Sequence, residues 1–392
     1  MIWQFNRIPQ IVFGVGARHR LTALMCSFGQ RVLLITGAHS FDAQSDSVEL
    51  LAQWEKAGLT LWREKVKGEP SPEWVDRCVQ RYAQHDIQLV IAIGGGSALD
   101  AAKAVAGLLP IQDSVMNYLE GVGTQLVYAA QALPFIAVPT TAGTGSEATK
   151  NAVLSRHGVD GFKKSFRDDS LMPRYAVVDP EWMLSLPASQ ISANGLDAIT
   201  QLIEGYTSIN ANMMTDALAL EGLRRGLAAL PRWVANPQDV LAATDMAYAA
   251  LVSGLVLAHA GLGAVHGMAS PLGAFFPAPH GAVCGILLAE TTRQNINALM
   301  QNEATSVALA RYADIARLLL DDPTIKEESA LILLIEQLQQ WQDVFKLPRL
   351  ADFGMTTADI ARVVENSRGN SMKTNPVVLS DAVLSDILYK CL

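Results

Sequence analysis

The segment IQLVIAIGGGSALDAAKAVAGLL, residues 87–109, carries the clearest fold signal in the chain. It begins with a nearly continuous apolar run, passes through three glycines and a serine, and ends in an alanine-rich stretch of helical spacing. A continuous apolar run of this length is typical of a strand buried on both faces, as in a parallel sheet covered by helices. The segment therefore predicts a buried strand followed directly by a helix.

Strand and helix patterns alternate on either side of this segment. The runs RVLLITG (31–37), LTLWREKV (59–66) and PFIAVPTT (134–141) predict further strands. The segments SVELLAQWEKAG (47–58) and SPEWVDRCVQRYAQHD (71–86) have the spacing of helices. This alternation predicts a parallel sheet with helices on both faces, which is an α/β domain of Rossmann-like type.

The pattern changes after about Pro180. Long Ala- and Leu-rich helical patterns follow, such as 215–234 and 328–345, and strand patterns disappear. A chain of 392 residues is long for a single hydrophobic core, so two domains are expected. We expect an α/β dinucleotide-binding domain over residues 1–185 and an all-helical metal-binding domain over residues 186–392.

Composition restricts the class of partner. The net charge of −8 argues against nucleic acid or an anionic membrane as the main partner. The four cysteines are far apart and form no C-x-x-C motif, which suits a reducing compartment. The N-terminus, MIWQFNRIPQIVFG, lacks the pattern of a signal peptide. We therefore expect a cytoplasmic protein.

The three glycines between strand and helix are a candidate site for the pyrophosphate of a dinucleotide. Glycines let backbone N–H groups approach an anion, and a helix N-terminus adds unpaired donors and a positive dipole end. Gly95, Gly96 and Ser97 are therefore cofactor-binding candidates, and Asp100 is expected to accept from a hydroxyl or to cap the helix. A plain strand–helix turn needs about one glycine, so three in a row favour the binding interpretation.

Two other strand ends bear on the cofactor. The segment VPTTAGTGSEATKN (138–151) offers hydroxyl groups for phosphate and ribose oxygens, from Thr140, Thr141 and Thr144. At the end of the strand 31–37, an acidic residue would favour NAD by binding the ribose 2′-hydroxyl. Gly37 is followed instead by Ala-His-Ser, without a carboxylate, so the sequence permits NADP as well as NAD.

From Met246 to Ala289 the chain has no Asp, Glu, Lys or Arg, yet it keeps three histidines. Two of them, His266 and His280, flank a Gly/Pro-rich segment that can fold back and bring both imidazoles to one point. Asp197 could complete a carboxylate–imidazole set suited to Zn²⁺ or Fe²⁺. Each residue also has an ordinary structural explanation, as a hydrogen-bonded core histidine or a helix cap. The charge-free stretch, with its histidines, prolines and glycines, is expected to be a protein core and not a membrane span.

Five motifs, in order, resemble the signatures of the iron-containing (group III) alcohol dehydrogenase family. They are GGGSALDAAKAV, PTTAGTGSEAT, GLDAITQLIEGY, GLGAVHGMASPLGA and PHGAVCGILL, within residues 91–288. The resemblance implies an N-terminal dinucleotide-binding domain and a helical metal domain, a plan shared with dehydroquinate synthase. It implies NAD or NADP and Fe²⁺ or Zn²⁺ as cofactors, with a small alcohol or aldehyde in the cleft between the domains. The metal would polarise the substrate oxygen while hydride passes to or from nicotinamide. We also expect a homodimer or a higher homo-oligomer.

The resemblance also assigns the metal ligands. Asp197, His266 and His280 match three of the four ligands that family members usually have. The fourth position is Gln201, whose carbonyl is a neutral and weaker ligand than imidazole. We therefore expect a weaker hold on iron or a preference for zinc.

Three further residues receive roles from the resemblance. Ser270 stands where many members carry a histidine that helps to relay the proton, so we expect its hydroxyl to pass a proton. His259, seven residues before His266, is hypothesised to replace part of the missing imidazole; the alternative is a hydrogen-bonded core histidine. Lys163 resembles a family lysine that reaches the cofactor ribose.

Three alternative functions stay open. A metal-free reductase resembling maleylacetate reductases is compatible with the loss of two histidine positions. A lyase resembling dehydroquinate synthase would need basic residues for a sugar phosphate, which the charge-free metal region does not supply. A redox-inactive paralogue would bind dinucleotide tightly and act as an assembly or scaffold subunit.

Overall fold

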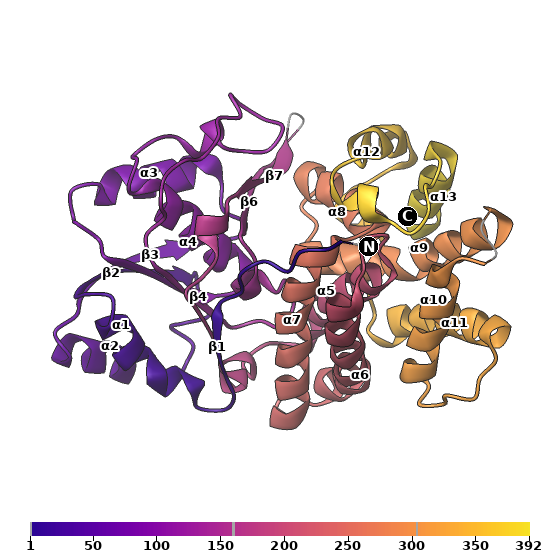
Figure 1. Ribbon diagram of the computed structural model, residues 1–392, viewed down its shortest axis with the longest axis horizontal. Coiled ribbons are helices and arrows are strands. Elements are labelled where there is room, and N and C mark those ends of the chain that lie inside the picture. The colour runs from indigo at the N-terminus through magenta and orange to yellow at the C-terminus, as the bar shows by residue number, and fades with distance from the viewer. Residues whose placement is uncertain (1, 159–160, 303–304) are drawn as a thin grey trace.

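The computed structural model describes residues 2–158, 161–302 and 305–392, which form a sheet domain and a helical domain side by side (Figure 1). The strands are β1 (Gln10–Phe13), β2 (Arg31–Gly37), β3 (Thr60–Val66), β4 (Leu89–Gly94), β5 (Phe135–Pro139), β6 (Asn151–Arg156), β7 (Phe162–Arg167) and β8 (Tyr175–Val178). The helices of the sheet domain are α1 (Leu21–Cys26), α2 (Ser47–Lys56), α3 (Pro72–Tyr82) and α4 (Gly96–Leu108). Those of the helical domain are α5 (Ala188–Thr207), α6 (Met213–Ala235), α7 (Val240–Ala260), α8 (Ala264–Phe275), α9 (His280–Asn302), α10 (Val307–Leu319), α11 (Glu327–Val344), α12 (Ile360–Asn366) and α13 (Asp381–Cys391).

The main sheet is parallel, as the alternation of strand and helix patterns predicts. Its order is β1-β8-β5-β4-β2-β3, and every neighbouring pair runs parallel. Leu33 and Ile35 of β2 face the core under α3 and α4, whereas Val32 and Leu34 face the core over α1 and α2. Because both faces of the sheet are buried at β2, consecutive residues of this strand are apolar. The antiparallel pair β6–β7 lies outside this sheet.

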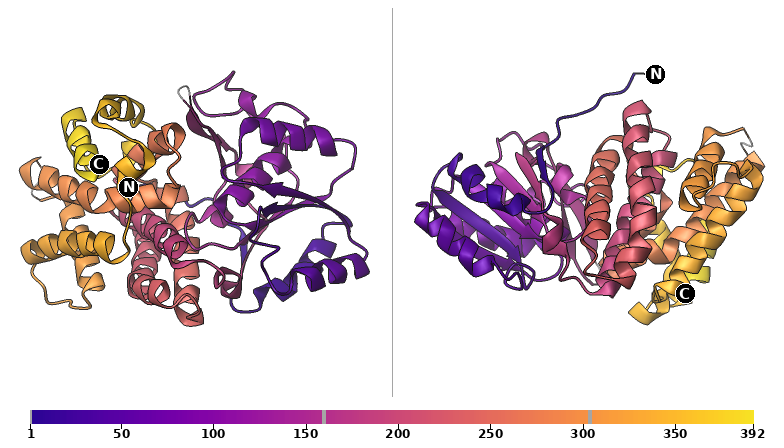
Figure 2. Two further views of the ribbon diagram at one scale, coloured as in Figure 1. Left: turned by 180° about the vertical axis from the view of Figure 1, so that it is seen from behind. Right: turned by 90° about the horizontal axis from the view of Figure 1, so that it is seen from below.

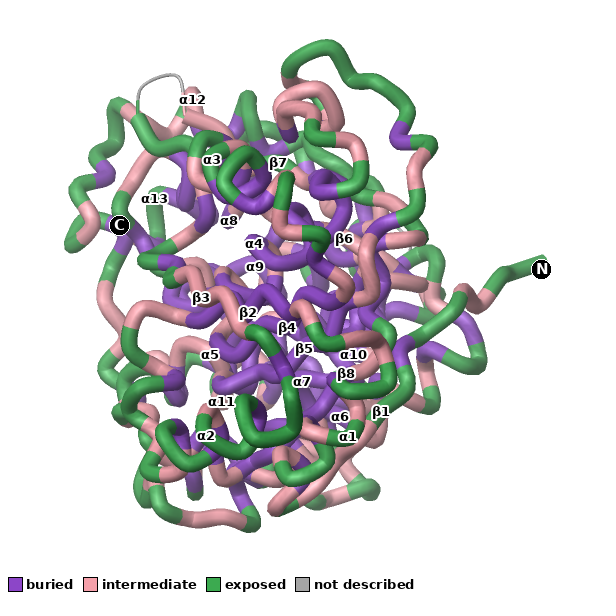
Figure 3. Tube along the Cα trace, turned by 90° about the vertical axis from the view of Figure 1, so that its left-hand side faces the viewer, coloured by how far each residue is buried: buried purple, intermediate pink, exposed green. Residues whose placement is uncertain are grey.

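Helices alone follow β8 in the part of the chain that the structure describes. This confirms the expected fold class, while the boundary at residue 185, between β8 and α5, stays a prediction. Helix α7 is long and apolar enough to cross a membrane by length and composition, but 67% of its most apolar window is buried inside the protein. It packs against α5 and α6 and is therefore a helix of the protein core. The buried trace in Figure 3 continues from the sheet into this helical core.

Two contacts tie the domains together. Gly145, in the loop after β5, has a φ of 61°, and a Cβ there would lie 2.4 Å from the backbone nitrogen of Gly254 in α7. The loop therefore packs backbone to backbone against the helical domain, which a larger residue would prevent. The residues that precede β1 leave the sheet domain and extend toward the helices (Figure 2). There Phe5 stacks on a histidine of α7.

Candidate metal centre and cofactor cleft

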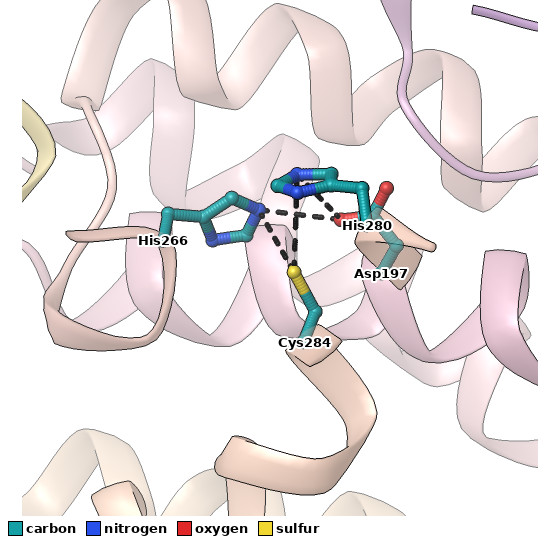
Figure 4. Close-up of side chains that lie close together, drawn as sticks. All are labelled: Asp197, His266, His280 and Cys284. Atoms are coloured by element: carbon teal, nitrogen blue, oxygen red, sulfur yellow. Dashed lines mark hydrogen bonds and ion pairs between the residues drawn. The ribbon is translucent and has the colours of Figure 1, made fainter. Parts of the chain in front are cut away.

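Four side chains from three helices of the helical domain point toward one another (Figure 4). Asp197 comes from α5, His266 from α8, and His280 and Cys284 from α9. Each offers one ligand atom, and all four atoms lie within 4.8 Å of one another. The Nε2 atom of His266 is 3.2 Å from Oδ1 of Asp197, and Nε2 of His280 is 4.0 Å from the same oxygen. We call these four residues the metal group, because carboxylate, imidazole and thiol are the ligands that transition metals bind in proteins.

The local sequence explains why α9 reaches α5. Helix α9 begins at His280 itself, directly after the Pro-containing turn that follows α8. A Cβ on Gly281 would lie 2.5 Å from the carbonyl oxygen of Ala193, so glycine allows α9 to touch the first part of α5. Residues four apart lie on one face of a helix, so His280 and Cys284 both face Asp197.

The electrostatics of the metal group favour a cation. Burial alone would raise the pKa of Asp197, but its interactions with His280 and His266 outweigh burial and lower that pKa to about 2. Burial and a neighbouring lysine cation lower the pKa of His280 to about 4, so its imidazole is neutral at pH 7. Burial disfavours a charged His266, but Cys284 and Glu204 raise the pKa of His266 well above its ordinary value. The group thus joins an ionised carboxylate, a neutral imidazole and a second imidazole that favours positive charge.

Glu204 orients His266 from the side away from the metal group. Its Oε2 is 2.6 Å from Nδ1 of His266, and its Oε1 accepts from the backbone N–H of Val265 at 2.6 Å. Because both oxygens of Glu204 accept, Nδ1 of His266 carries the donated proton and Nε2 is the atom that faces Asp197. Glu204 is buried and lies seven residues after Asp197 on α5.

Replacing Glu204 by Gln is expected to lower metal affinity about 10–100-fold, the usual cost of losing a residue that orients a ligand. The Gln carbonyl can keep the bond to Val265, but its amide group then opposes the N–H at Nδ1 of His266 and favours the wrong tautomer. Metal affinity is measured by competition with a chelator. Glu221→Gln, at a partly exposed position paired with Arg224, is the control. An unchanged affinity in Glu204→Gln would contradict this role.

Gln201, predicted as the fourth ligand, is turned away from such a role in this structure. Its Nε2 donates to Oδ1 of Asp197 at 3.2 Å, and its carbonyl oxygen accepts from the hydroxyl of Ser253 at 2.8 Å. The amide nitrogen, which cannot bind a metal, therefore faces the metal group. The sequence reasoning placed Gln201 on the correct helix face but could not determine how its amide is held.

His259 does not join the metal group, so the hypothesis that it replaces the missing imidazole is corrected. Its Nδ1 lies 2.6 Å from the carbonyl oxygen of Leu255, and its Nε2 accepts from the backbone N–H of Asn6 at 3.0 Å. Its ring stacks on Phe5 with 3.7 Å between centroids. Gly261, with a φ of 75°, ends α7 before α8 begins, so His259 and His266 do not share one helix. His259 is a hydrogen-bonded structural histidine.

Ser270 and Lys163 meet where the sheet domain contacts α8. The Ser270 hydroxyl donates to the backbone carbonyl of Lys163 at 3.3 Å, one helical turn after His266. The Nζ atom of Lys163 pairs with Glu69 at 2.5 Å, and the charge of Lys163 is among the causes that lower the pKa of His280. Glu69 thus holds Lys163 beside the metal group, and the sequence did not predict this pair. The contact of Lys163 with a cofactor ribose stays a prediction, as does proton transfer through Ser270.

The glycine turn (residues 94–97) and the threonine loop (residues 140–145) lie against each other at the ends of β4 and β5. A Cβ on Gly96 would lie 2.7 Å from the side chain of Thr144. A Cβ on Gly94 would lie 3.0 Å from the backbone nitrogen of Gly37, so the end of β2 reaches the same place. Gly95 precedes α4 as its N-cap, and Ser97 lies in the first turn. These ends form the crevice where open parallel sheets bind ligands.

The other predicted cofactor residues, Thr140, Asp100 and Thr141, differ in their partners. The Thr140 hydroxyl is buried and has no hydrogen-bond partner among the described residues, as expected for a group that a ligand completes. Asp100 does accept from a hydroxyl, but from that of Ser146 at 2.5 Å, and its other oxygen accepts from the N–H of Val153. It therefore joins the loop after β5 to α4. Thr141 lies next to Gly95, within 3.3 Å of a Cβ built there.

The threonine loop also touches the helix that carries Asp197. A Cβ on Gly143 would lie 3.0 Å from the Cβ of Asn194, one turn before Asp197. The glycine turn, the threonine loop and α5 therefore form one continuous chain of contacts. The dinucleotide candidates and the metal group lie on the two sides of the same domain junction.

A cavity of about 490 Å³ opens beside His266. Its walls come from β7, α8, the loop between α4 and β5, the end of α12 and the segment after it. Among the residues that the structure describes, no apolar side chain lines it. The charged and polar lining residues are Glu120, Gln125, Lys163, Lys164, Ser165, Arg167, His266, Ser270, Asn366, Asn370 and Ser371. Cations outnumber the single carboxylate, so this cavity suits a polar or anionic group.

Residues 9–180 match the model of iron-containing alcohol dehydrogenase, and residues 191–392 match that of the C-terminal part of the Fe-containing alcohol dehydrogenase family. The chain is 29% identical to the NAD-dependent methanol dehydrogenase of Bacillus methanolicus over 98% of each protein. It is 31% identical to alcohol dehydrogenase 4 of Saccharomyces cerevisiae strain YJM789, over 98% of this chain and 97% of the yeast protein. The structure of the alcohol dehydrogenase from Oenococcus oeni has a TM-score of 0.89 at 26% identity and covers 100% of both chains.

The matches cover both domains, and the fold and the buried metal group agree with them. The chain therefore belongs to the iron-containing alcohol dehydrogenase family and is an oxidoreductase that acts on the CH–OH group of an alcohol.

Proposed function

We propose that this enzyme transfers hydride between a nicotinamide dinucleotide and a small alcohol or aldehyde, with a divalent metal held by Asp197, His266 and His280. The observation that carries the proposal is the position of these three side chains. Their ligand atoms gather within 4.8 Å in a buried group, at the junction with the loop that follows β5. A metal at this group supplies Lewis-acid polarisation of the substrate oxygen.

The residues of the chain supply binding, orientation and proton transfer. Backbone N–H groups at Gly95, Gly96 and Ser97 hold the pyrophosphate at the start of α4, and Thr140 donates its unpaired hydroxyl to the cofactor. Burial of Asp197, His266 and Cys284, beside a partly exposed His280, lowers the local dielectric and strengthens the charge interactions within the metal group. Ser270 passes a proton between the substrate oxygen and the polar cavity, because its hydroxyl lines that cavity one turn from His266.

We propose that the enzyme accepts NAD and NADP. The similar methanol dehydrogenase of Bacillus methanolicus is NAD-dependent. In this chain the first carboxylate after β2, Asp42, is paired with Arg63 at 2.7 Å and Lys65 at 2.6 Å. The two cations neutralise the charge that would repel a 2′-phosphate, and they offer donors to it.

We further propose that the substrate carries a polar or anionic group at the end remote from its reacting carbon. The cavity beside His266 has Lys164 and Arg167 in its lining and no apolar side chain. An aldehyde with a distal carboxylate or hydroxyl is expected to have a kcat/KM about tenfold above that of an alkyl aldehyde of equal length, which corresponds to ~1.4 kcal/mol. Lys164→Met should reduce this preference. A clear preference for the alkyl aldehyde would contradict the proposed substrate class.

The test of the proposed function is a panel of aldehydes with NADH and NADPH, on protein stripped of metal and reloaded with Fe²⁺ or Zn²⁺. Aldehyde-dependent oxidation of the nucleotide that requires reloading supports the proposal. Full activity without metal would establish the metal-free reductase instead. Tight dinucleotide binding without any aldehyde-dependent oxidation would establish the scaffold alternative.

The oligomeric state and the cellular location of the enzyme are two further proposals. β1 is an edge strand of the sheet, and Ile11 on it is exposed, as is Trp3 before it. An exposed apolar edge of this kind favours pairing with a second copy, so we propose a homodimer or a higher homo-oligomer. The four cysteines are free, three of them buried, which fits the proposed cytoplasmic location.

A further inference from the structure

The metal group contains one candidate ligand to which the sequence analysis gave no role, the thiol of Cys284. Its Sγ lies 3.7 Å from Nε2 of His266 and 3.9 Å from Nε2 of His280. Cys284 is fully buried, and it lies one helical turn after His280 on α9. Its side chain points into the group from below the two imidazoles in Figure 4.

The separations between the donor atoms match those of a tetrahedral site. Zn–N and Zn–O bonds of about 2.1 Å and a Zn–S bond of about 2.3 Å place two light donors ~3.4 Å apart and sulfur ~3.6 Å from nitrogen. The separations are 3.2 Å from Asp197 to His266, 4.0 Å from Asp197 to His280, 3.7 Å from Cys284 to His266 and 3.9 Å from Cys284 to His280. They differ from the tetrahedral values by at most ~0.6 Å. The four side chains therefore need only small movements to share one ion.

Gln201 is held away from the same position. Its amide donates to Asp197 and accepts from Ser253. Rotating the amide so that its oxygen faced the group would bring two acceptors, Oε1 of Gln201 and Oδ1 of Asp197, to the present 3.2 Å separation. It would also replace the accepting carbonyl at Ser253 with an N–H group. Both changes disfavour Gln201 as a ligand relative to Cys284.

We propose that Cys284, as a thiolate, is the fourth protein ligand and takes the place of the missing histidine. This inference rests on the proposed function, because it assumes that the metal group holds the ion. The thiol releases one proton when the metal binds. The soft thiolate among these donors favours Zn²⁺ over Fe²⁺, which prefers harder ligands, and the substrate oxygen would bind as a fifth ligand, as catalytic zinc sites allow. The enzyme is therefore a zinc-selective member of an iron-containing family.

The test is spectroscopic and uses the full-length protein with Co²⁺ in place of the native metal. A thiolate ligand gives a sulfur-to-cobalt charge-transfer band in the near ultraviolet, which imidazole and carboxylate do not. The wild type is expected to show this band, and Cys284→Ser is expected to lose it together with ~100-fold or more of Zn²⁺ affinity, since even residues that only orient ligands contribute about 10–100-fold. Cys391→Ser is the matched control, because this buried thiol bonds to the carbonyl of Ile286 and not to the metal group.

Several results would overturn the proposal. One is a wild-type cobalt complex without the band; another is a band that persists in Cys284→Ser. A Zn²⁺ affinity that falls in Gln201→Leu but not in Cys284→Ser would assign the ligand to Gln201. If Cys284→Ser does not fold, X-ray absorption on wild-type zinc protein decides, since a sulfur neighbour at about 2.3 Å is required. A zinc–sulfur bond in a protein that does not oxidise NAD(P)H with any aldehyde would refute the proposed function and leave this inference intact.

Discussion

Replacing Asp197 by Ala is expected to lower kcat/KM for aldehyde reduction about 1,000-fold. A Lewis-acidic metal contributes several kcal/mol to the transition state, and each ~1.4 kcal/mol is a factor of ten in rate. Asp197 is the carboxylate of the metal group, is 2% exposed, and has its pKa lowered to about 2, so it supplies a full negative charge to the ion. Loss of that charge should release the metal. Elemental analysis and steady-state kinetics on the same preparations measure both effects.

Two further variants make the Asp197 result specific. Asp197→Asn keeps the shape of the side chain and its bond to Gln201 but removes the charge, so it should also lose metal. Asp245→Asn, on α7 and paired with Arg225, removes a carboxylate from the same domain away from the metal group and should keep metal and activity. Undiminished turnover by a folded, metal-free Asp197→Ala protein would refute the metal-dependent mechanism.

Replacing Lys103 by Met is expected to destabilise the protein by about 3–5 kcal/mol, the usual cost of breaking a buried charge network from one side. Lys103 has no exposed surface, and its Nζ donates to Ser146 at 2.7 Å, to Thr149 at 3.0 Å and to the carbonyl of Asn151 at 2.9 Å. It also lies 3.3 Å from Asp100. Methionine would fill the space but leave these acceptors unpaired. Denaturant unfolding measures the loss.

The loss of stability caused by Lys103→Met should also increase with pH. Burial raises the pKa of Glu147 to about 7, and the charge of Lys103 opposes that rise. Without Lys103 the pKa of Glu147 rises further, so the native state keeps a proton that the unfolded chain releases, and stability falls as pH increases. The destabilisation should therefore be larger at pH 8 than at pH 5. Lys150→Met, at a partly exposed pair with Asp169, should cost less than about 1 kcal/mol. A similarly small cost for Lys103→Met would contradict the network.

The parallel sheet could be predicted because its strands carry their own signal. β2 was expected at 31–37 and is found at Arg31–Gly37, since burial on both faces requires an unbroken apolar run. The four-residue strands β1 and β8 and the pair β6–β7 were not predicted. The burial patterns of β6 and β7 mix buried and exposed positions, and such short strands resemble loops in sequence.

The metal group could be predicted in part, because the motifs supplied Asp197, His266 and His280. Glu204 and Cys284 were missed, although each had a signal in its spacing: Glu204 is two turns after Asp197, and Cys284 is one turn after His280. Spacing along a helix predicts which residues share a face, but it does not predict which of them another helix approaches.

The contacts of His259 could not be predicted from the sequence. Its partner at Nε2 is the backbone of Asn6, 253 residues away along the chain. No local pattern predicts that an N-terminal segment satisfies a histidine on α7. The orientation of the Gln201 amide has the same cause, because Ser253 on a neighbouring helix fixes it.

The most direct measurement of the central claim is a titration of Zn²⁺ into metal-stripped wild-type protein, followed by aldehyde-dependent oxidation of NAD(P)H. Activity is expected to rise from baseline and to saturate at one metal ion per chain, and the Asp197→Ala and Asp197→Asn variants should fail to respond. Stripped protein that already turns over at the full rate, or a bound metal that leaves the rate unchanged, would contradict the claim that this buried group is the catalytic centre.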